Sequence, residues 1–441
     1  MLYVLLAILI IVAFVITFQR VELGFAIIIV IPLFKDVFLL PTEQIPILNL
    51  SFIFAIFTIM SFVYNYSFNI NKIRLEQKHI ILFLAFVLML LISLIYTNEM
   101  KYGIEKVAKF IFFNGFLFVG GMVVFQEEKR TRNFIEFLKY SILIISIVNV
   151  VLLIKYLLSG TLLQHIIVRF TITESNNPIN LARVAGLGVL LWFLSIFQSK
   201  DLKHKIIGWL ALIPIIVSLI ATNTRGPILF TLLIILGYLF FYLNISIKQK
   251  ILAIGLLVVV GIALMLILPE SMYDRFSLLF QKGNLNIEKN LWMSSSSGRR
   301  LIFAKRILQY VSNHPLTLFA GVGAGGFANL FKDYGIYSYP HNIFLEILFE
   351  QGLVGISIFM FSIIIFIEEI NIVILRNNKF KELLLPLLFS VIYFFLNAQV
   401  SGDIERNRLL WLFWGASIGV MIQYFKSTTR VQNISKFSHI I

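Results

Sequence analysis

The chain is dominated by apolar runs of about twenty residues, which is the length that a helix needs to cross the hydrocarbon of a bilayer. These runs recur along almost all of its 441 residues. A soluble core of this size does not need a composition that is 59% hydrophobic and includes 44 phenylalanines. The sequence therefore predicts an all-α polytopic membrane protein, with residues 1–441 forming a single integral membrane domain of twelve or thirteen transmembrane helices.

The first run has no basic residues before it and no small-residue cleavage site after it, so we interpret it as a retained helix and not as a signal peptide. The expected spans are 2–18, 22–40, 45–66, 79–96, 109–126, 135–158, 178–197, 206–222, 227–243, 251–268, 343–374, 384–400 and 409–425. Lys35 and Asp36 interrupt the second run, which leaves its number of helices open. Cysteine is absent, so disulfides, thiol catalysis and Cys-ligated metal are excluded.

Basic residues collect in every second loop between these spans, as expected of loops that stay on the cytoplasmic side. The C-terminal tail, with Lys426 and Arg430, falls on that same side. This alternation accounts for the net charge of +15 without nucleic acid as a partner. It predicts a multi-pass membrane protein with one long extracytoplasmic loop, residues 269–342, inserted between transmembrane helices.

The long loop is expected to contain short helices, because Ser294–Gly298 forms a cap signal ahead of helical spacing. Leu301, Ala304, Leu308 and Val311 share one face of that predicted helix. Its N-terminus, together with Arg299, would attract an anion. The alternative is an ordinary amphipathic helix lying on the bilayer with its basic residues against lipid phosphates. The spacing leaves both interpretations open.

Arginine is the dominant polar residue on the expected outer face, at Arg169, Arg183, Arg225, Arg299, Arg300, Arg406 and Arg408. Any one of them could snorkel to headgroups or pair with a carboxylate such as Glu174 or Asp403. Arg225 is different, because it stands in a turn of only a few residues before Gly226-Pro227 and has no room to reach away from the bundle. Guanidinium groups bind phosphate oxygens in a bidentate manner, so several on one face predict a shared anion site.

Two further motifs lie in the last part of the long loop. Gly321–Gly326 formally contains GxGxxG, but it lacks the strand and the βαβ context of a dinucleotide site, so a flexible turn or a close approach of the backbone to a ligand is expected instead. His341 lies where the loop re-enters the membrane and is a candidate general base toward a hydroxyl. A structural role for His341 is the alternative.

Several of these segments together resemble the O-antigen ligase/polymerase (Wzy and WaaL) superfamily, from about Arg169 onward. They are Asn177-Pro178-Ile179-Asn180, Thr224-Arg225-Gly226, the stretch from Gly298-Arg299 through Pro315 to Gly321–Phe327, and Pro340-His341-Asn342-Ile343-Phe344-Leu345-Glu346 with Glu350 and Gly352-Leu353-Val354-Gly355. The pattern His-Asn-x-x-Leu-Glu-x-x-x-Glu-x-Gly-x-x-Gly after a long external loop is the most specific part.

The resemblance implies a metal-independent integral-membrane glycosyltransferase without cofactors, which uses a polyprenyl diphosphate-linked oligosaccharide on the extracytoplasmic side. The catalytic residues that it implies are His341, which would activate the acceptor hydroxyl, and Arg225 and Arg299, which would hold the donor diphosphate. Further candidates for substrate binding are Arg169, Asn177, Arg183, Arg300, Asn342, Arg406 and Arg408.

The expected function is polymerisation of lipid-linked repeat units into a capsular or O-antigen-like polysaccharide. The main alternative is a ligase, which would transfer the finished glycan to a terminal acceptor. A lipid-linked oligosaccharide flippase is a third class, disfavoured because the deep parts of the spans are nearly bare of charge. Membrane lipids, a flippase and chain-length regulator proteins are candidate partners, and no nucleic acid is expected.

Overall fold

The computed structural model describes residues 2–33, 50–67, 76–158, 177–242, 247, 248, 251, 255, 296–334 and 339–438. All regular elements in this part of the chain are helices. Seven of them are long and apolar enough to cross a membrane, and four shorter apolar helices accompany them. The prediction of an all-α polytopic membrane protein is confirmed. The total of twelve or thirteen spans stays a prediction, because the expected span 251–268 lies almost entirely outside the described residues.

Each expected span whose residues are described contains a helix, although several helices begin four to nine residues earlier than expected. Before the long loop they are α1 (Leu2–Gln19), α2 (Val21–Val30) with η1 (Ile31–Leu33), α3 (Leu50–Ser67), α4 (Gln77–Ser93), α5 (Met100–Lys109), the π-helix η4 (Phe110–Gly115), α6 (Phe116–Val124), α7 (Glu128–Leu158), α8 (Pro178–Gln198), α9 (Leu202–Ala221) and α10 (Arg225–Phe241). After its described start they are α13 (Ser296–Asn313), α14 (Thr317–Ala320), η6 (Gly326–Tyr334), α15 (Ile343–Arg376), α16 (Asn378–Ala398) and α17 (Arg408–Ser438).

α17 packs along α6 in the interior of the bundle. Small residues make this possible, because a Cβ at Gly415 would collide with the carbonyl oxygen of Phe118, and one at Gly419 would lie 2.7 Å from that of Met122. In a membrane, where lipid tails are as apolar as leucine, such close backbone packing is a main source of helix association. The pair therefore forms a rigid centre for the bundle.

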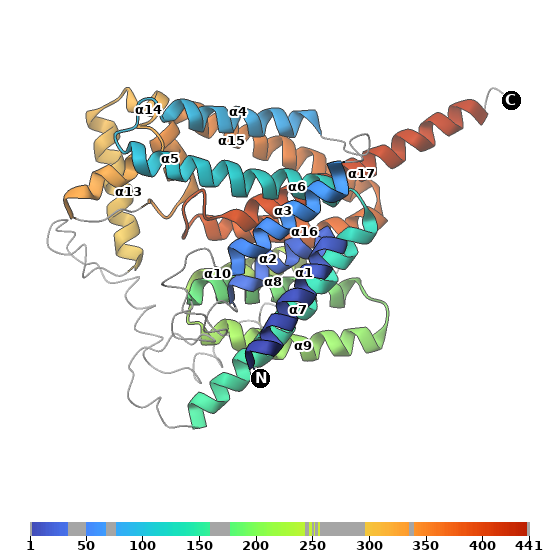
Figure 1. Cartoon of the computed structure of the whole chain (residues 1–441). Coiled ribbons are helices and arrows are strands. Elements are labelled where there is room, and N and C mark those ends of the chain that lie inside the picture. The colour runs from blue at the N-terminus through green and yellow to red at the C-terminus, as the bar shows by residue number, and fades with distance from the viewer. Residues whose placement is uncertain are drawn as a thin grey trace.

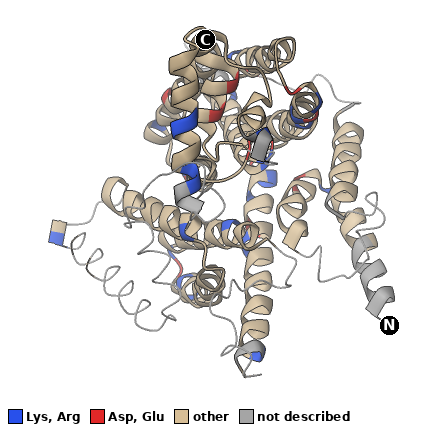
Figure 2. Ribbon diagram, turned by 90° about the vertical axis from the view of Figure 1, so that its left-hand side faces the viewer, with Lys and Arg blue, Asp and Glu red and all other residues tan. Residues whose placement is uncertain are grey.

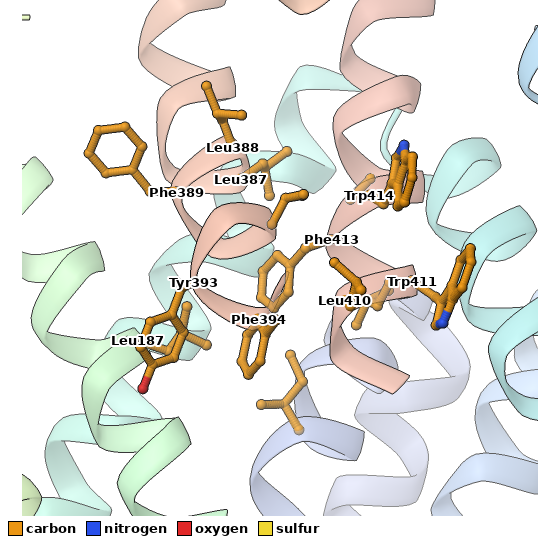
Figure 3. Close-up of a cluster of buried hydrophobic side chains, with 14 of the residues drawn as sticks. Leu187, Leu387, Leu388, Phe389, Tyr393, Phe394, Leu410, Trp411, Phe413 and Trp414 are labelled. Atoms are coloured by element: carbon orange, nitrogen blue, oxygen red, sulfur yellow. The ribbon is translucent and has the colours of Figure 1, made fainter. Parts of the chain in front are cut away.

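α16 joins α17 through a cluster of large side chains (Figure 3). Phe394 and Phe413 stack at 5.5 Å between ring centroids, and Trp411 and Trp414 stack at 5.7 Å. This packing fixes the ends of the two helices and hence the turn that joins them, residues 399–407, which we call the α16–α17 turn. That turn is the part of the fold on which the candidate site depends.

α13 lies across one end of the bundle, roughly at right angles to the long helices (Figure 1). The predicted helix is confirmed, but its predicted apolar face is wrong. Leu301 and Leu308 are 57% and 67% exposed, while Ile302, Phe303 and Ile307 are buried. The buried face is set by the pocket that Phe327 and Phe349 offer, where Phe303 meets Phe327 edge to face at 5.4 Å. The packing against Phe327 and Phe349, and not the spacing of the leucines, determines which face of α13 is buried.

Candidate active site

α15 breaks at Gly352, close to the end of the bundle that α13 covers. Gly352 has φ +66°, a conformation that favours glycine, and the helix continues on both sides of it. The carbonyls of Phe349 and Glu350 accept hydrogen bonds from the amides of Val322 and Gly323 at 2.9 and 3.0 Å. The loop thus supplies amide donors to carbonyls at the break. Loop and helix are thereby joined through their backbones.

The glycine motif in this loop brings its backbone close to other parts of the chain, whereas the sequence predicted a flexible turn or a close approach to a ligand. Gly321, Gly323 and Gly325 all have positive φ, at 78°, 88° and 76°. A Cβ at Gly321 would collide with the backbone of Glu350, and one at Gly323 with Ser93 and Thr97. The approach is therefore to the backbone of α15 and of the segment between α4 and α5, and the motif is accounted for by chain packing.

His341 lies just before α15, in the left-handed region at φ +59°, which is unusual for a residue with a side chain. Its ring is parallel to that of Phe303 of α13, with 6.1 Å between centroids, and lies 4.5 Å from that of Tyr339. Nδ1 is buried and has no hydrogen-bond partner among the described residues. Strained backbone and unpaired buried nitrogens cluster at functional sites, which favours a chemical role for His341 over a purely structural one.

Three arginines surround this imidazole. Burial first, and then the charges of Arg300, Arg299 and Arg406, lower the pKa of His341 from 6.5 to about 4. The neutral form therefore predominates at neutral pH, as a general base requires. Burial also lowers the pKa of Arg300, as does the neighbouring charge of Arg299, so these two guanidinium groups repel each other in the absence of an anion. The structure thus brings Arg299, Arg300 and His341 together.

The α16–α17 turn brings Arg406 to the same place. Its guanidinium lies 5.3 Å from the centre of the Tyr339 ring, and its Nε is 3.2 Å from Glu405. Arg408 is 3.7 Å from the same carboxylate and lies over the ring of Phe113 at 4.3 Å. Both arginines therefore have a local partner, and that partner is Glu405, whereas the sequence suggested Asp403. In Figure 2 this end of the bundle faces the viewer.

Two more predicted arginines approach the same turn. Arg183 of α8 donates to the carbonyl of Ser401 at 2.9 Å, and its Nε is buried without a partner among the described residues. Arg225 is the first residue of α10, and the neighbouring Gly226 lies against Val400. Both therefore stand near the α16–α17 turn, as expected if they share an anion with the other arginines.

The two asparagines serve as helix caps, and their predicted binding role stays a prediction. Asn342 accepts from the amide of Leu345 and donates to the carbonyl of Gln399, which ties α15 to the α16–α17 turn. Asn177 accepts from Ile179 at the start of α8. No contact of Asn177 with His341 or the arginines is present in the described part of the chain. Arg169 lies outside the described residues.

Sequence reasoning missed an ionic cluster buried beneath this site, made of Tyr102, Lys106, Glu346, Glu350 and Asp403. Lys106 of α5 is 2.6 Å from Glu346, 2.6 Å from Glu350 and 3.2 Å from Asp403, and all four side chains are at most 1% exposed. Tyr102 donates to Asp403 at 2.9 Å. The cluster lies in α5 and in the first turns of α15, at the end of the bundle that carries His341, so the expectation that the deep segments are nearly bare of charge stays a prediction. The available signal was a pair of glutamates four residues apart at the start of an apolar span, whereas Lys106 precedes the expected span 109–126.

The three carboxylates of this cluster surround an ammonium group. Within the described residues, no group of three or more His, Cys, Asp or Glu side chains is arranged to hold a metal ion. The candidate site itself holds an imidazole in its neutral form beside several guanidinium groups. Such a site can accept a proton from a hydroxyl and stabilise a developing anion such as a departing diphosphate.

Fold and site together define a helical multi-pass membrane protein with a cationic, histidine-containing site at one end of its bundle. A comparison with protein-family models matches residues 210–360 to the family described as O-antigen ligase. The match supports membership of the O-antigen ligase/polymerase superfamily, and it confirms the resemblance found in the sequence. It also supports an O-antigen ligase or polymerase type of function and a glycosyltransferase-like activity in the membrane. A search of curated proteins found no match.

Proposed function

We propose that this protein transfers a glycan from a polyprenyl diphosphate carrier to a sugar hydroxyl, and that it does so as a polymerase of lipid-linked repeat units at the outer face of the cytoplasmic membrane. The observation that carries the proposal is the buried imidazole of His341, whose Nδ1 has no hydrogen-bond partner among the described residues, beside Arg299, Arg300 and Arg406. A base next to a set of guanidinium groups fits a reaction in which a hydroxyl loses a proton while a diphosphate leaves.

In this mechanism the acceptor hydroxyl gives its proton to His341 as its oxygen forms a bond to the anomeric carbon of the donor. The bond from that carbon to the diphosphate oxygen breaks, and the electron pair leaves with the diphosphate. Arg225, Arg299 and Arg300 stabilise this charge through bidentate hydrogen bonds. Because the displacement is a single step without an enzyme nucleophile, the product has the inverted anomeric configuration.

The second candidate is a ligase, which shares the donor chemistry but passes the finished glycan to a terminal acceptor. It is favoured by the description of the matched family as O-antigen ligase. Deleting the gene in its host and sizing the surface and lipid-linked glycans separates the two. Loss of long chains, with single repeat units persisting on the lipid, indicates a polymerase. Long chains that accumulate on the carrier without reaching a final acceptor indicate a ligase.

Variants then test the site itself. Arg225→Ala, Arg299→Ala and His341→Ala are each expected to abolish polymer while the protein remains in the membrane at its normal level. The control is Lys305→Ala, which removes an exposed cation from α13 outside the set that surrounds His341. Full-length polymer from all three variants would show that the chemistry is elsewhere.

A further inference from the structure

The buried cluster around Lys106 has more acid than base. Glu346, Glu350 and Asp403 all point at one ammonium group, and none of these side chains is more than 1% exposed. Carboxylates that share a buried site do not all ionise, because uncompensated negative charge in a low dielectric is costly. The cluster therefore retains at least one proton. Tyr102, which donates to Asp403, is the other titratable group packed against it.

The contacts indicate where this proton lies. The carboxyl groups of Glu346 and Asp403 are within hydrogen-bonding reach of each other. Oδ1 of Asp403 is buried and lies 3.2 Å from the ammonium group of Lys106, and besides this ion pair it has no hydrogen-bond partner among the described residues. Burial alone would raise the pKa of Asp403, but Lys106 and the hydrogen bonds from Glu346 and Tyr102 lower it to about 2. A proton on Glu346, donated to Asp403, satisfies both groups.

The cluster joins three segments of the chain, which are α5, the start of α15 and the α16–α17 turn. Lys106 belongs to α5, while Glu346 and Glu350 occupy the first turns of α15, directly after His341. Glu346 also accepts from the amide of Ile404 at 3.1 and 3.2 Å. Asp403 lies in the α16–α17 turn, three residues before Arg406. Its position therefore determines where Arg406 lies relative to His341.

We propose that Lys106, together with the proton shared by Glu346 and Asp403, is a positioning device that holds the α16–α17 turn, and with it Arg406, against His341. Lys106 touches neither donor nor acceptor in this proposal, and it acts through Asp403 and Glu346. The inference deepens the proposed function and rests on it for its catalytic consequence. Its structural consequence, a fixed turn, can be measured without any substrate.

The test uses the purified full-length protein in lipid nanodiscs and compares Lys106→Met with the double variant K106M/E350Q. Three carboxyl groups and one ammonium that share one proton carry a net charge of −1, and two carboxyl groups that share one proton carry the same charge. The double variant therefore restores the charge that Lys106→Met alone disturbs. Lys139→Met is the control, because Lys139 is equally buried and paired with Glu136, but lies near the other end of α8 beside Ser195.

Lys106→Met is expected to lower kcat with a lipid-linked donor by at least about tenfold at neutral pH, because a misplaced turn misaligns the reacting groups. Part of that loss is regained at lower pH, where added protons replace the missing positive charge. K106M/E350Q recovers most of the activity at neutral pH, and Lys139→Met is unaffected. Activity of Lys106→Met within about twofold of the parent, or no gain in the double variant, overturns the proposal.

Hydrogen exchange across residues 399–407 gives a second readout that needs no substrate. Exchange is expected to quicken in Lys106→Met and to return toward the parental rate in K106M/E350Q. Infrared absorption of a protonated carboxyl group is expected in the parent and is lost in Glu346→Gln. Unchanged exchange in Lys106→Met refutes the positioning role. If the parent does not turn over a lipid-linked donor, the proposed function fails, while the exchange result still decides the role of Lys106.

Discussion

The low pKa of His341 leads to a specific pH dependence of catalysis. Burial and the charges of Arg300, Arg299 and Arg406 lower this pKa from 6.5 to about 4. At pH 5.5 an imidazole with a pKa of 6.5 is about 9% neutral, whereas one with a pKa of about 4 is about 97% neutral. If His341 is the general base, kcat/KM at pH 5.5 is therefore expected to remain close to its neutral value, where an ordinary histidine would lose about tenfold.

The assay is the initial rate of glycan transfer by the protein in nanodiscs, with subsaturating donor, so that kcat/KM reports the free enzyme. A donor and an acceptor without ionisable sugars keep the substrates from contributing to the profile. The expected curve is flat from pH 8 to about 5.5 and falls as the pH approaches 4. A fall in kcat/KM with its midpoint near pH 6.5 would refute the reasoning about the environment of His341.

Acid stability has to be measured alongside, and its sign follows from the same shift. The folded pKa of His341 lies below that of the unfolded chain, so between pH 6.5 and about 4 the unfolded chain binds the proton that the folded one does not. The contribution of His341 to stability is complete above pH 6.5 and diminishes as the pH falls through that window. Thermal unfolding at each pH separates this effect from catalysis. Arg300→Ala is expected to raise the pH at which kcat/KM falls, but not as far as 6.5, because burial is the largest cause of the lowered pKa of His341.

Two further predictions concern the supporting structure and the anion site. Gly352→Ala is expected to lower the melting temperature, because φ is +66° there and the backbone of Phe319 fills the space of a Cβ, whereas Gly237→Ala in α10, with nothing within 4 Å, is the matched control. Equal melting temperatures for the two variants would contradict the role assigned to the break in α15. Arg183→Lys keeps the charge but loses the planar donor set, so KM for the donor should rise severalfold, and an unchanged KM would remove Arg183 from the donor site.

The helices could be predicted from sequence because the bilayer leaves the chain few options. Every backbone group in hydrocarbon must be paired within its own segment, so a long apolar run becomes a helix. The start of α8 at Pro178 also agrees with the expected span, whereas α10 starts at Arg225, two residues before its expected span and at a residue that the sequence placed in a turn. α13 shows the limit of this reasoning. The local sequence predicts that this helix forms, but the face that it buries depends on Phe327 and Phe349, which come later in the chain.

The candidate site was predictable in its parts but not in its arrangement. His341, Arg299 and Arg225 could be found because each stands in a short, recognisable motif. Lys106 could not be assigned in the same way, because its meaning comes from Glu346 and Asp403, about 240 and 300 residues away in the chain. A buried lysine needs partners of opposite charge, and only the fold identifies them.

The matched family segment, residues 210–360, carries Arg225, Arg299 and His341. It does not carry Lys106, which precedes it, or Asp403 and Arg406, which follow it. The geometry around His341 depends on all of them, because Glu346 accepts from the amide of Ile404 and pairs with Lys106 at 2.6 Å. The proposed catalytic residues are therefore held by contacts from both flanks of the chain. Moving the matched segment alone into another bundle would transfer these residues without the contacts that position them.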